Sequence, residues 1–303
     1  MQRREFLRTV GLTSIAASFP VSGGVAHRSR LAVGLELISV LAPMGVEFRQ
    51  TLQKVAAIGY TEVETLGSLG RSPDEVYQVL AQCHLRSPAQ HLVPDDLYEI
   101  YQRWDRGDLT LPQAIAHLQE GYALEKLDHI IEQGIARAHT LRQQFLVWPV
   151  LFDDQVASPS ALQVVIEAFN CAGELCRQSG LTFAFHNGSN ASRRMDQATA
   201  YDLILKQTDP ATVKMELDTY YLAKAGASAR AYLVNYPNRY PLMHLKDIDD
   251  HGEIADLGRG SIDFADLLNA ARHAGVQHFF VEHDRAVDPF GSARTSLDYL
   301  HHL

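Results

Sequence analysis

From Leu31 onward, short apolar runs alternate along the chain with longer amphipathic stretches. The short runs are rich in β-branched, aromatic and leucine residues, as strands are. They fall at 32–40, 61–66, 86–92, 144–150, 181–187, 212–218, 241–246 and 278–283. Helical periodicity predicts helices between them, over 47–58, 73–84, 112–138, 160–178, 195–207, 222–233, 262–274 and 291–302. Strands and helices that alternate in this way predict an α/β fold of one domain, a closed (β/α)8 TIM barrel.

Residues at the helix ends support these boundaries. Ser72 followed by Pro73 is typical of an N-cap and a first-turn proline, and Asp263 is placed to cap the helix that follows it. Gly59, Gly180 and Gly275 each stand just before an apolar run, where a glycine commonly ends a helix. The same joint between helix and strand is therefore expected three times.

We assign residues 31–303 to a single barrel domain, because no second boundary interrupts the alternation. The region 95–138 is longer than one helix requires, and the polar stretch at 105–108 breaks it. We interpret this region as a helical insertion after the third strand that covers the site.

The first 26 residues have the pattern of an export signal. Arg3, Arg4 and Arg8 precede a run without charge from Thr9 to Ala26. The paired arginines resemble those of a twin-arginine signal, although the usual Ser or Thr before the pair is missing. The resemblance implies the twin-arginine translocase as a partner during export and a periplasmic or otherwise exported protein. An uncleaved anchor or an amphipathic helix is the alternative.

Composition and charge exclude several classes of function. The chain is 46% hydrophobic and 21% charged, which is ordinary for a globular protein. Its formal net charge of -9 argues against nucleic acid as a partner and against electrostatic binding to a membrane surface. Three cysteines are too few, and odd in number, for a disulfide framework.

The candidate chemistry lies at the ends of the last three predicted strands. In a TIM barrel the carboxyl ends of the strands form the active-site rim, and alternate residues point inward. Asp218, His244 and Glu282 stand at corresponding strand ends. A polar side chain at the end of an apolar strand is costly unless it is paired or bound to a ligand. Two carboxylates and an imidazole therefore predict a site for a divalent ion, Mn²⁺, Mg²⁺, Co²⁺ or Zn²⁺.

Several motifs resemble the xylose isomerase-like TIM barrels known as sugar phosphate isomerases/epimerases. These motifs are Met215-Glu216-Leu217-Asp218, His244-Leu245-Lys246-Asp247, Asp256-Leu257-Gly258-Arg259-Gly260 and Val281-Glu282-His283-Asp284-Arg285. The resemblance covers nearly all of the chain after the export signal. In that family an acid on strand 5, an Asp on strand 6, a His on strand 7 and a Glu on strand 8 hold the metal. Asp218, His244 and Glu282 match the last three.

Strand 5 departs from this pattern. His186 stands where the metal-binding epimerases have a glutamate, and Asn187 and Gly188 follow it. A neutral imidazole can still complete the ligand set. The resemblance implies that two glutamates transfer the proton in such epimerases, and only Glu282 remains here. The second acid or base would then be His186, Lys246 or another rim group. The alternative for His186 is a packed side chain that contacts no metal.

Other rim residues are candidates for substrate binding. They are Glu36, Glu64, His91, Trp148, Asn187 and Arg285, and Trp148 could stack against a sugar face. Lys246 shares the inward parity of His244 and could polarise a carbonyl. The alternatives are barrel filling for the strand residues and salt bridges for Lys246, with Glu216 or Glu282, and for Arg285, with Asp284 or Asp288.

The leading function is a divalent-metal-dependent isomerase or epimerase that acts on a free sugar or keto-sugar by proton transfer next to a carbonyl. The alternative is a lyase or dehydratase on a keto-sugar or keto-inositol, because the same barrel type includes inosose dehydratase. A non-catalytic sugar-binding protein is a third class. In each case a small-molecule carbohydrate is the expected partner. Association into a homo-oligomer stays open.

Overall fold

A computed structural model describes residues 33–303, and the proposed export signal lies outside the described residues. The barrel belongs to one compact unit that spans residues 31–303. Among the described residues, no helix has both the length and the apolar character needed to span a bilayer.

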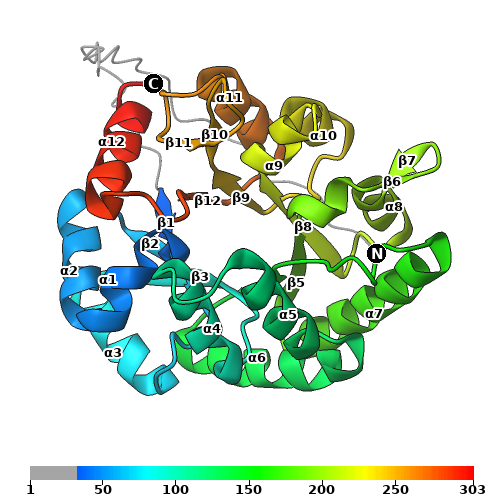
Figure 1. Ribbon diagram of the computed structural model, residues 1–303, viewed down its shortest axis with the longest axis horizontal. Coiled ribbons are helices and arrows are strands. Elements are labelled where there is room, and N and C mark those ends of the chain that lie inside the picture. Colours follow the sequence, from blue (N-terminus) through cyan, green and yellow to red (C-terminus); the bar gives the residue numbers. More distant parts are fainter. Residues whose placement is uncertain (1–32) are drawn as a thin grey trace, which may run out of the picture. The chain divides into compact units, whose positions relative to one another are not determined.

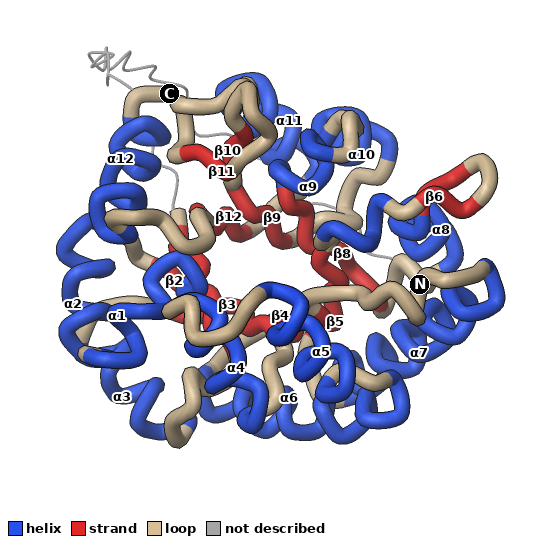
Figure 2. The backbone as a smooth tube through the Cα atoms, in the orientation of Figure 1, coloured by secondary structure: helices blue, strands red, loops and turns tan. Residues whose placement is uncertain are grey.

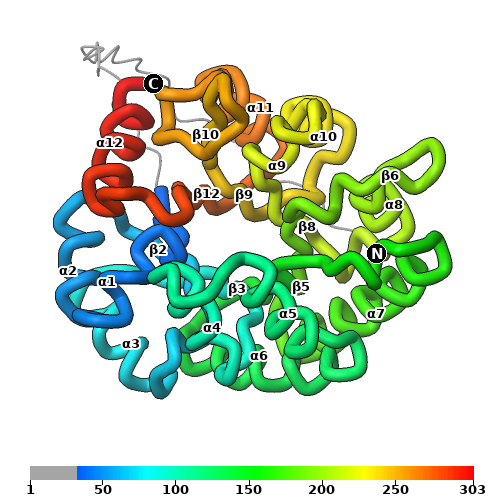
Figure 3. Tube along the Cα trace, in the orientation of Figure 1, coloured from blue at the N-terminus to red at the C-terminus, as the bar shows by residue number. Residues whose placement is uncertain are grey.

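Eight parallel strands close into a barrel in the order β1-β12-β9-β8-β5-β4-β3-β2. They are β1 (Gly34–Glu36), β2 (Glu62–Leu66), β3 (Arg86–His91), β4 (Phe145–Trp148), β5 (Thr182–His186), β8 (Val213–Asp218), β9 (Leu242–Leu245) and β12 (His278–Val281). Figures 1 and 2 show these strands as a central ring with the helices outside it. The colours of Figure 3 run around the ring in order, so each strand lies beside its predecessor in the chain. The predicted TIM barrel is confirmed.

In the part of the chain that the structure describes, twelve α-helices surround the barrel. They are α1 (Leu41–Val46), α2 (Phe48–Ile58), α3 (Pro73–Gln82), α4 (Asp95–Asp105), α5 (Leu111–Gly121), α6 (Leu127–Leu141), α7 (Pro159–Gln178), α8 (Ala200–Gln207), α9 (Thr219–Lys224), α10 (Ala229–Asn235), α11 (Phe264–Ala274) and α12 (Pro289–His301). The expected caps form, since the Ser72 and Asp263 side chains accept the backbone N–H groups of Glu75 and Asp266. Gly275 ends α11 in the left-handed region with a φ of 86°.

Four predicted elements differ from the structure. The strand expected at 32–40 ends at Glu36, because the chain turns into a 3-10 helix, Leu37–Val40, from which Leu37 and Val40 are buried in the core. The helix expected over 112–138 is divided into α5 and α6 by a short 3-10 helix, Leu124–Lys126.

The third and fourth differences lie after β5 and β8. The helix expected from 195 begins only at Ala200, where a capping box starts α8, and a hairpin of β6 (Arg194–Met195) and β7 (Ala198–Thr199) precedes it. The helix expected over 222–233 is divided into α9 and α10 at Gly226, whose φ of 70° interrupts a helix.

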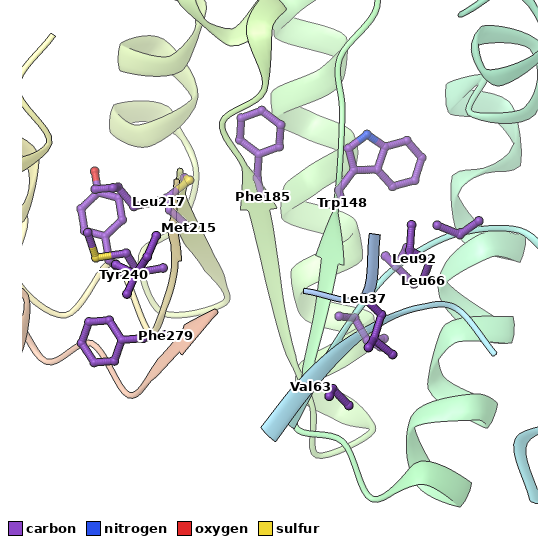
Figure 4. Packing of buried hydrophobic residues seen from close by; sticks show 14 of the residues in the cluster. Leu37, Val63, Leu66, Leu92, Trp148, Phe185, Met215, Leu217, Tyr240 and Phe279 are labelled. Carbon is purple, nitrogen blue, oxygen red and sulfur yellow. The ribbon is translucent and has the colours of Figure 1, made fainter. Parts of the chain in front are cut away.

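Alternation along the strands separates two sets of buried side chains. Inside the barrel, one small apolar cluster is formed by Ala89, Phe145, Val147, Ala184, Leu242 and Phe280. Residues of the opposite parity pack under the helices in a larger cluster, which includes Phe185, Met215 and Leu217 (Figure 4). Toward the carboxyl ends of the strands, the inward-facing residues become polar. The alternation that builds the core therefore also directs these polar side chains into the barrel.

Candidate metal centre

Four inward residues from neighbouring strands converge at the carboxyl end of the barrel. His186 ends β5, Asp218 ends β8, His244 lies in β9 and Glu282 follows β12, and these strands are adjacent in the barrel. The register pairs Asp218 directly with His244. One ligand atom from each of the four residues lies within 4.8 Å of the others, and all four residues are buried. We call this set the donor cluster.

The facing atoms of the donor cluster lie close to one another and make no hydrogen bond outside the cluster. These atoms are His186 Nε2, Asp218 Oδ2, His244 Nδ1 and Glu282 Oε2. His244 Nδ1 lies 2.6 Å from Glu282 Oε2, and His186 Nε2 lies 3.5 Å from Asp218 Oδ2. Buried polar atoms that make no hydrogen bond outside their own cluster are costly, and four of them in one place would suit a bound cation. Two imidazole nitrogens and two carboxylate oxygens fit a divalent ion such as Zn²⁺, Co²⁺ or Mn²⁺.

Hydrogen bonds outside the cluster orient its donors. His186 Nδ1 lies 2.9 Å from the Pro149 carbonyl oxygen, so Nδ1 carries the proton and Nε2 presents a lone pair. Asp218 Oδ1 accepts the Tyr221 N–H at 2.9 Å and so caps α9. These contacts favour His186 as a ligand over His186 as an acid or base.

The Asn187 amide holds the backbone of Asp218. Its Oδ1 accepts the Asp218 N–H at 2.8 Å, and its Nδ2 donates to the Asp218 carbonyl at 3.1 Å. The side chain is buried, and both its oxygen and its nitrogen are engaged in these hydrogen bonds. Asn187 therefore positions Asp218, and its candidacy for substrate binding stays a prediction.

A second cluster, the paired cluster, consists of Glu64, His91, Glu216 and His244. Its imidazole nitrogens have carboxylate partners. His244 Nε2 lies 2.7 Å from Glu64 Oε2, and His91 Nε2 lies 2.9 Å from Glu216 Oε2. The second oxygens of Glu64 and Glu216 have no hydrogen-bond partner. Because Nε2 of His244 is directed at Glu64, its Nδ1 is free to face the donor cluster.

The paired cluster changes the interpretation of two candidates for substrate binding. Glu64 is 0% exposed and contacts His244, while His91 is 7% exposed and contacts Glu216. Both side chains therefore contact other members of the paired cluster, which orients His244 of the donor cluster.

Lys246 lies between two carboxylates at the edge of the donor cluster. Its Nζ is 2.8 Å from Glu282 Oε1 and 2.6 Å from Asp284 Oδ2. Burial alone would lower the pKa of Lys246, but the Asp284 and Glu282 charges outweigh it and raise the pKa well above the usual value. Burial raises the pKa of Asp284 to about 7, with Lys246 opposing and Glu282 adding to the shift. A cation and a carboxyl that can be protonated near neutral pH therefore adjoin Glu282.

Glu36 is a buried carboxyl without partners. It is 1% exposed, and neither of its oxygens makes a hydrogen bond. It pairs in register with Glu64, and the pairing of Leu35 with Val281 places it beside Glu282. Burial, and then the Glu64 charge, raise the pKa of Glu36 well above the usual value. The raised pKa favours the neutral form of Glu36, which keeps its candidacy for binding a substrate oxygen.

Trp148 does not face the rim. Its parity is opposite to that of Val147, which belongs to the inner cluster. The ring is 0% exposed, and its centroid lies 5.3 Å from that of Tyr122 and 6.1 Å from that of Phe169. Figure 4 shows it beside Phe185 among the buried side chains. This placement corrects our expectation that Trp148 stacks against a sugar.

Arg285 is exposed and lies at a φ of 55° in the loop after β12. Its guanidinium carbon is 5.4 Å from the centroid of Trp104, a residue of α4. This cation–π contact links the last loop of the barrel to the helices inserted after β3. It leaves Arg285 a candidate for an anionic substrate group.

Sequence reasoning left three residues out of the candidate list. Glu216 belongs to the paired cluster, Asp284 binds Lys246, and the ring of Tyr221 faces His186 with centroids 6.1 Å apart. Glu216 and Asp284 share the parity of Asp218 and Glu282, so the alternation that selected Lys246 could have identified them. Tyr221 lies on a helix, and no strand pattern points to it.

Comparisons with known proteins agree with this geometry. The family model described as "Xylose isomerase-like TIM barrel" matches residues 52–303. An inosose dehydratase of Geobacillus thermodenitrificans (strain NG80-2) is 25% identical over 173 residues, which cover 50% of this chain and 57% of the relative. The chain therefore spans little more than half the length of this curated relative.

Solved structures show the same fold. A sugar phosphate isomerase/epimerase from Parabacteroides distasonis ATCC 8503 superposes with a TM-score of 0.70 at 23% identity, covering 93% of this chain and 98% of that one. A structure of the IOLI protein with a zinc atom superposes with a TM-score of 0.60 at 14% identity, covering 88% of this chain and 95% of that one.

Proposed function

Because the chain belongs to the xylose isomerase-like TIM barrel family, we propose that it is a divalent-metal-dependent isomerase or epimerase of a free sugar or keto-sugar. The observation that carries this proposal is the donor cluster, with four buried donor atoms that face one another and make no hydrogen bond outside the cluster. A bound divalent ion supplies Lewis acidity there, which makes the proton on the carbon beside a carbonyl more acidic. The similar isomerase/epimerase from Parabacteroides distasonis supports the same class of reaction.

Glu282 is the proposed base. Burial alone would raise the pKa of Glu282, but the charges of Lys246 and His244 hold it well below the usual value. Glu282 is therefore ionised at neutral pH and can accept the proton. Lys246 is placed to donate a hydrogen bond to the substrate oxygen on which negative charge develops. Asp284, with a pKa near neutral pH, is suited to supply a proton in return.

A second candidate is a lyase or dehydratase that acts on a keto-sugar or keto-inositol. The specific observation in its favour is the geometry of His186, whose Nδ1 proton is held by Pro149 and whose Nε2 faces the cluster. One ionised base and one protonated acid, Glu282 and Asp284, are the set that an elimination requires. The similar inosose dehydratase supports this alternative.

Turnover in D₂O separates the two reactions. The protein would be loaded with Mn²⁺, Co²⁺, Zn²⁺ or Mg²⁺ and incubated with ketoses and a keto-inositol. We expect solvent deuterium beside the carbonyl and an epimer of otherwise equal mass, whereas the alternative predicts a product that has lost water. Glu282→Gln should abolish exchange, and Glu132→Gln, at an exposed position of α6, is the matched control. Sugar binding that survives metal removal without any exchange would instead indicate a binding protein.

We further propose that the protein is exported through the twin-arginine pathway. The support is the Arg3–Arg4 pair and the uncharged run that follows it. Export fits a free sugar or keto-sugar, because sugar phosphates are cytoplasmic metabolites. Replacing both arginines with lysine should retain the protein in the cytoplasm on cell fractionation. Unchanged export of that variant would contradict the proposal.

A further inference from the structure

A pocket of about 240 Å³ opens beside the donor cluster. Its walls come from the segment that follows β5 and from α9 and α10, which follow β8. Figure 1 shows the β6–β7 hairpin, α8 and α9 grouped at this side of the barrel. The pocket therefore lies on the carboxyl-terminal face, next to the two strands that carry His186 and Asp218.

Tyr221 and Asn187 are shared between the pocket and the donor cluster. Both line the pocket. The Tyr221 ring meets the His186 ring edge-on with centroids 6.1 Å apart, and Lys246 Nζ lies 5.2 Å from the Tyr221 centroid. Asn187 follows His186 in the chain and holds the backbone of Asp218. Tyr221 and Asn187 are therefore the residues through which the pocket adjoins the donor cluster.

The lining of the pocket differs in chemistry from the donor cluster. Tyrosine rings and small or branched apolar side chains dominate it, including Tyr201, Tyr232, Leu222 and Ala227. Arg194 is the one charged side chain among the lining residues that the structure describes, and no carboxylate joins it. The donor cluster, by contrast, has two carboxylates. Such a lining suits an apolar, flat and uncharged group, because aromatic faces and alkyl groups offer contact area but few hydrogen bonds.

The segments that form this pocket are longer than a barrel requires. Most connections between a strand and its helix have about 2–6 residues. Here the segment 187–199 contains a 3-10 helix and the β6–β7 hairpin before α8 begins. Extended loops at this face are where barrel enzymes acquire their specificity.

We propose that this pocket binds the aglycone of an aryl glycoside, so that the substrates are keto-glycosides with an apolar aromatic substituent. The inference rests on the proposed function, since that function places the reacting sugar ring at the donor cluster. It narrows the substrate class from free sugars to sugars that carry a flat group beyond the reacting ring. Tyr221 stands between the two subsites and contacts both halves of such a substrate.

A binding experiment tests this assignment without requiring turnover. Phenyl β-glucoside, methyl β-glucoside and cellobiose would be titrated calorimetrically into the metal-loaded protein. We expect phenyl β-glucoside to bind at least tenfold more tightly than methyl β-glucoside. Ala225→Trp fills the pocket from an exposed position and should reduce the affinity for the phenyl compound to that of the methyl compound. Ala231→Trp, exposed on α10 and outside the lining, should leave both affinities unchanged.

Two further measurements keep the outcomes distinct. Ser192→Trp fills the pocket from the other wall and repeats the test if Ala225→Trp fails to fold. Equal affinities for the phenyl and methyl compounds, or a gain for cellobiose as large as that for the phenyl compound, would overturn the aglycone assignment. A preference for the phenyl compound in a protein that exchanges no proton would support the pocket and refute only the proposed reaction. Proton exchange without that preference would refute only the pocket.

Discussion

The donor cluster and the paired cluster share His244 and the same residue types, yet they differ in their hydrogen bonds. In the paired cluster both facing imidazole nitrogens lie within 2.9 Å of a carboxylate oxygen in a hydrogen bond. In the donor cluster His186 Nε2 has no hydrogen-bond partner, and His244 Nδ1 faces only Glu282 Oε2, a member of the same cluster, at 2.6 Å. Two carboxylates and two histidines thus form hydrogen-bonded imidazole–carboxylate pairs in one cluster, and a ligand set without hydrogen bonds to outside groups in the other.

This difference shows that residue type alone does not define a metal site. A buried imidazole that donates to a carboxylate has already used that nitrogen, whereas one without a partner presents a lone pair. His244 takes part in both clusters, because Nε2 is directed at Glu64 and Nδ1 is directed at Glu282 in the donor cluster. The paired cluster therefore orients the imidazole through which the donor cluster binds its ion.

The largest effect should come from removing one donor. Asp218→Asn keeps the shape of the side chain and a good N-cap for α9, but it replaces the unpartnered Oδ2 carboxylate oxygen. We expect metal content to fall to background and activity to be lost by roughly a thousandfold or more. Metal analysis and a steady-state assay measure this change, and thermal unfolding controls for the fold. Full metal content in this variant would contradict the claim that the donor cluster binds the metal and the paired cluster does not.

A smaller effect is expected from the paired cluster. Glu64→Gln removes the carboxylate that accepts from His244 Nε2 but leaves all four donors in place. Loss of such an outer partner typically weakens metal affinity by about 10–100-fold. Calorimetric titration with Zn²⁺ or Mn²⁺ should place this variant between the natural protein and Asp218→Asn. A loss equal to that of Asp218→Asn would mean that Glu64 is itself a ligand.

The two clusters also predict how metal binding depends on pH. Burial alone would lower the pKa of His244, but the Glu216 and Glu282 charges outweigh it and raise the pKa well above 6.5. The raised pKa favours the protonated imidazole in the metal-free protein. Metal binding must displace that proton, so affinity should rise with pH by about tenfold per pH unit for each proton released. The stabilisation of the metal-free fold by this proton is complete below pH 6.5 and is lost as the pH rises through the raised pKa. Calorimetry in buffers of different ionisation enthalpy counts the protons, and a count of zero would contradict the assignment.

The smallest effect on activity is expected at Trp148. The ring packs against Tyr122 and Phe169 outside the barrel, so Trp148→Phe should leave kcat/KM within about twofold. The lost packing should reduce the free energy of unfolding by about 1–2 kcal/mol, a typical cost for a smaller core side chain. Chemical denaturation and a steady-state assay measure both quantities. A large loss of activity in a stable variant would indicate that Trp148 contacts the substrate after all.

The barrel could be predicted because its strands have clear apolar runs. Its helices also have recognisable ends, with Ser or Asp as N-caps and glycine at several C-termini. The missed boundaries are places where a local feature competes with periodicity. A capping box begins α8 late, and the positive φ of Gly226 divides the helix expected over 222–233. Neither feature changes the apolar pattern, so the pattern could not reveal it.

The convergence of His186, Asp218, His244 and Glu282 followed from parity and from a family resemblance, and the structure brings all four together. Their role as ligands stays a prediction. The position of a residue at the end of a strand does not by itself show that its side chain faces the site. Trp148 ends β4, but its side chain points toward the helices. The division between donor and paired clusters depends on which atoms face each other across the barrel, and a sequence does not contain that information.

A crystal structure of the metal-loaded protein, with anomalous data at the zinc or cobalt edge, tests the central claim most directly. We predict one peak within about 2.0–2.3 Å of His186 Nε2, Asp218 Oδ2, His244 Nδ1 and Glu282 Oε2. A peak among Glu64, His91 and Glu216 instead, or no peak inside the barrel, would contradict the assignment of the donor cluster as the metal site.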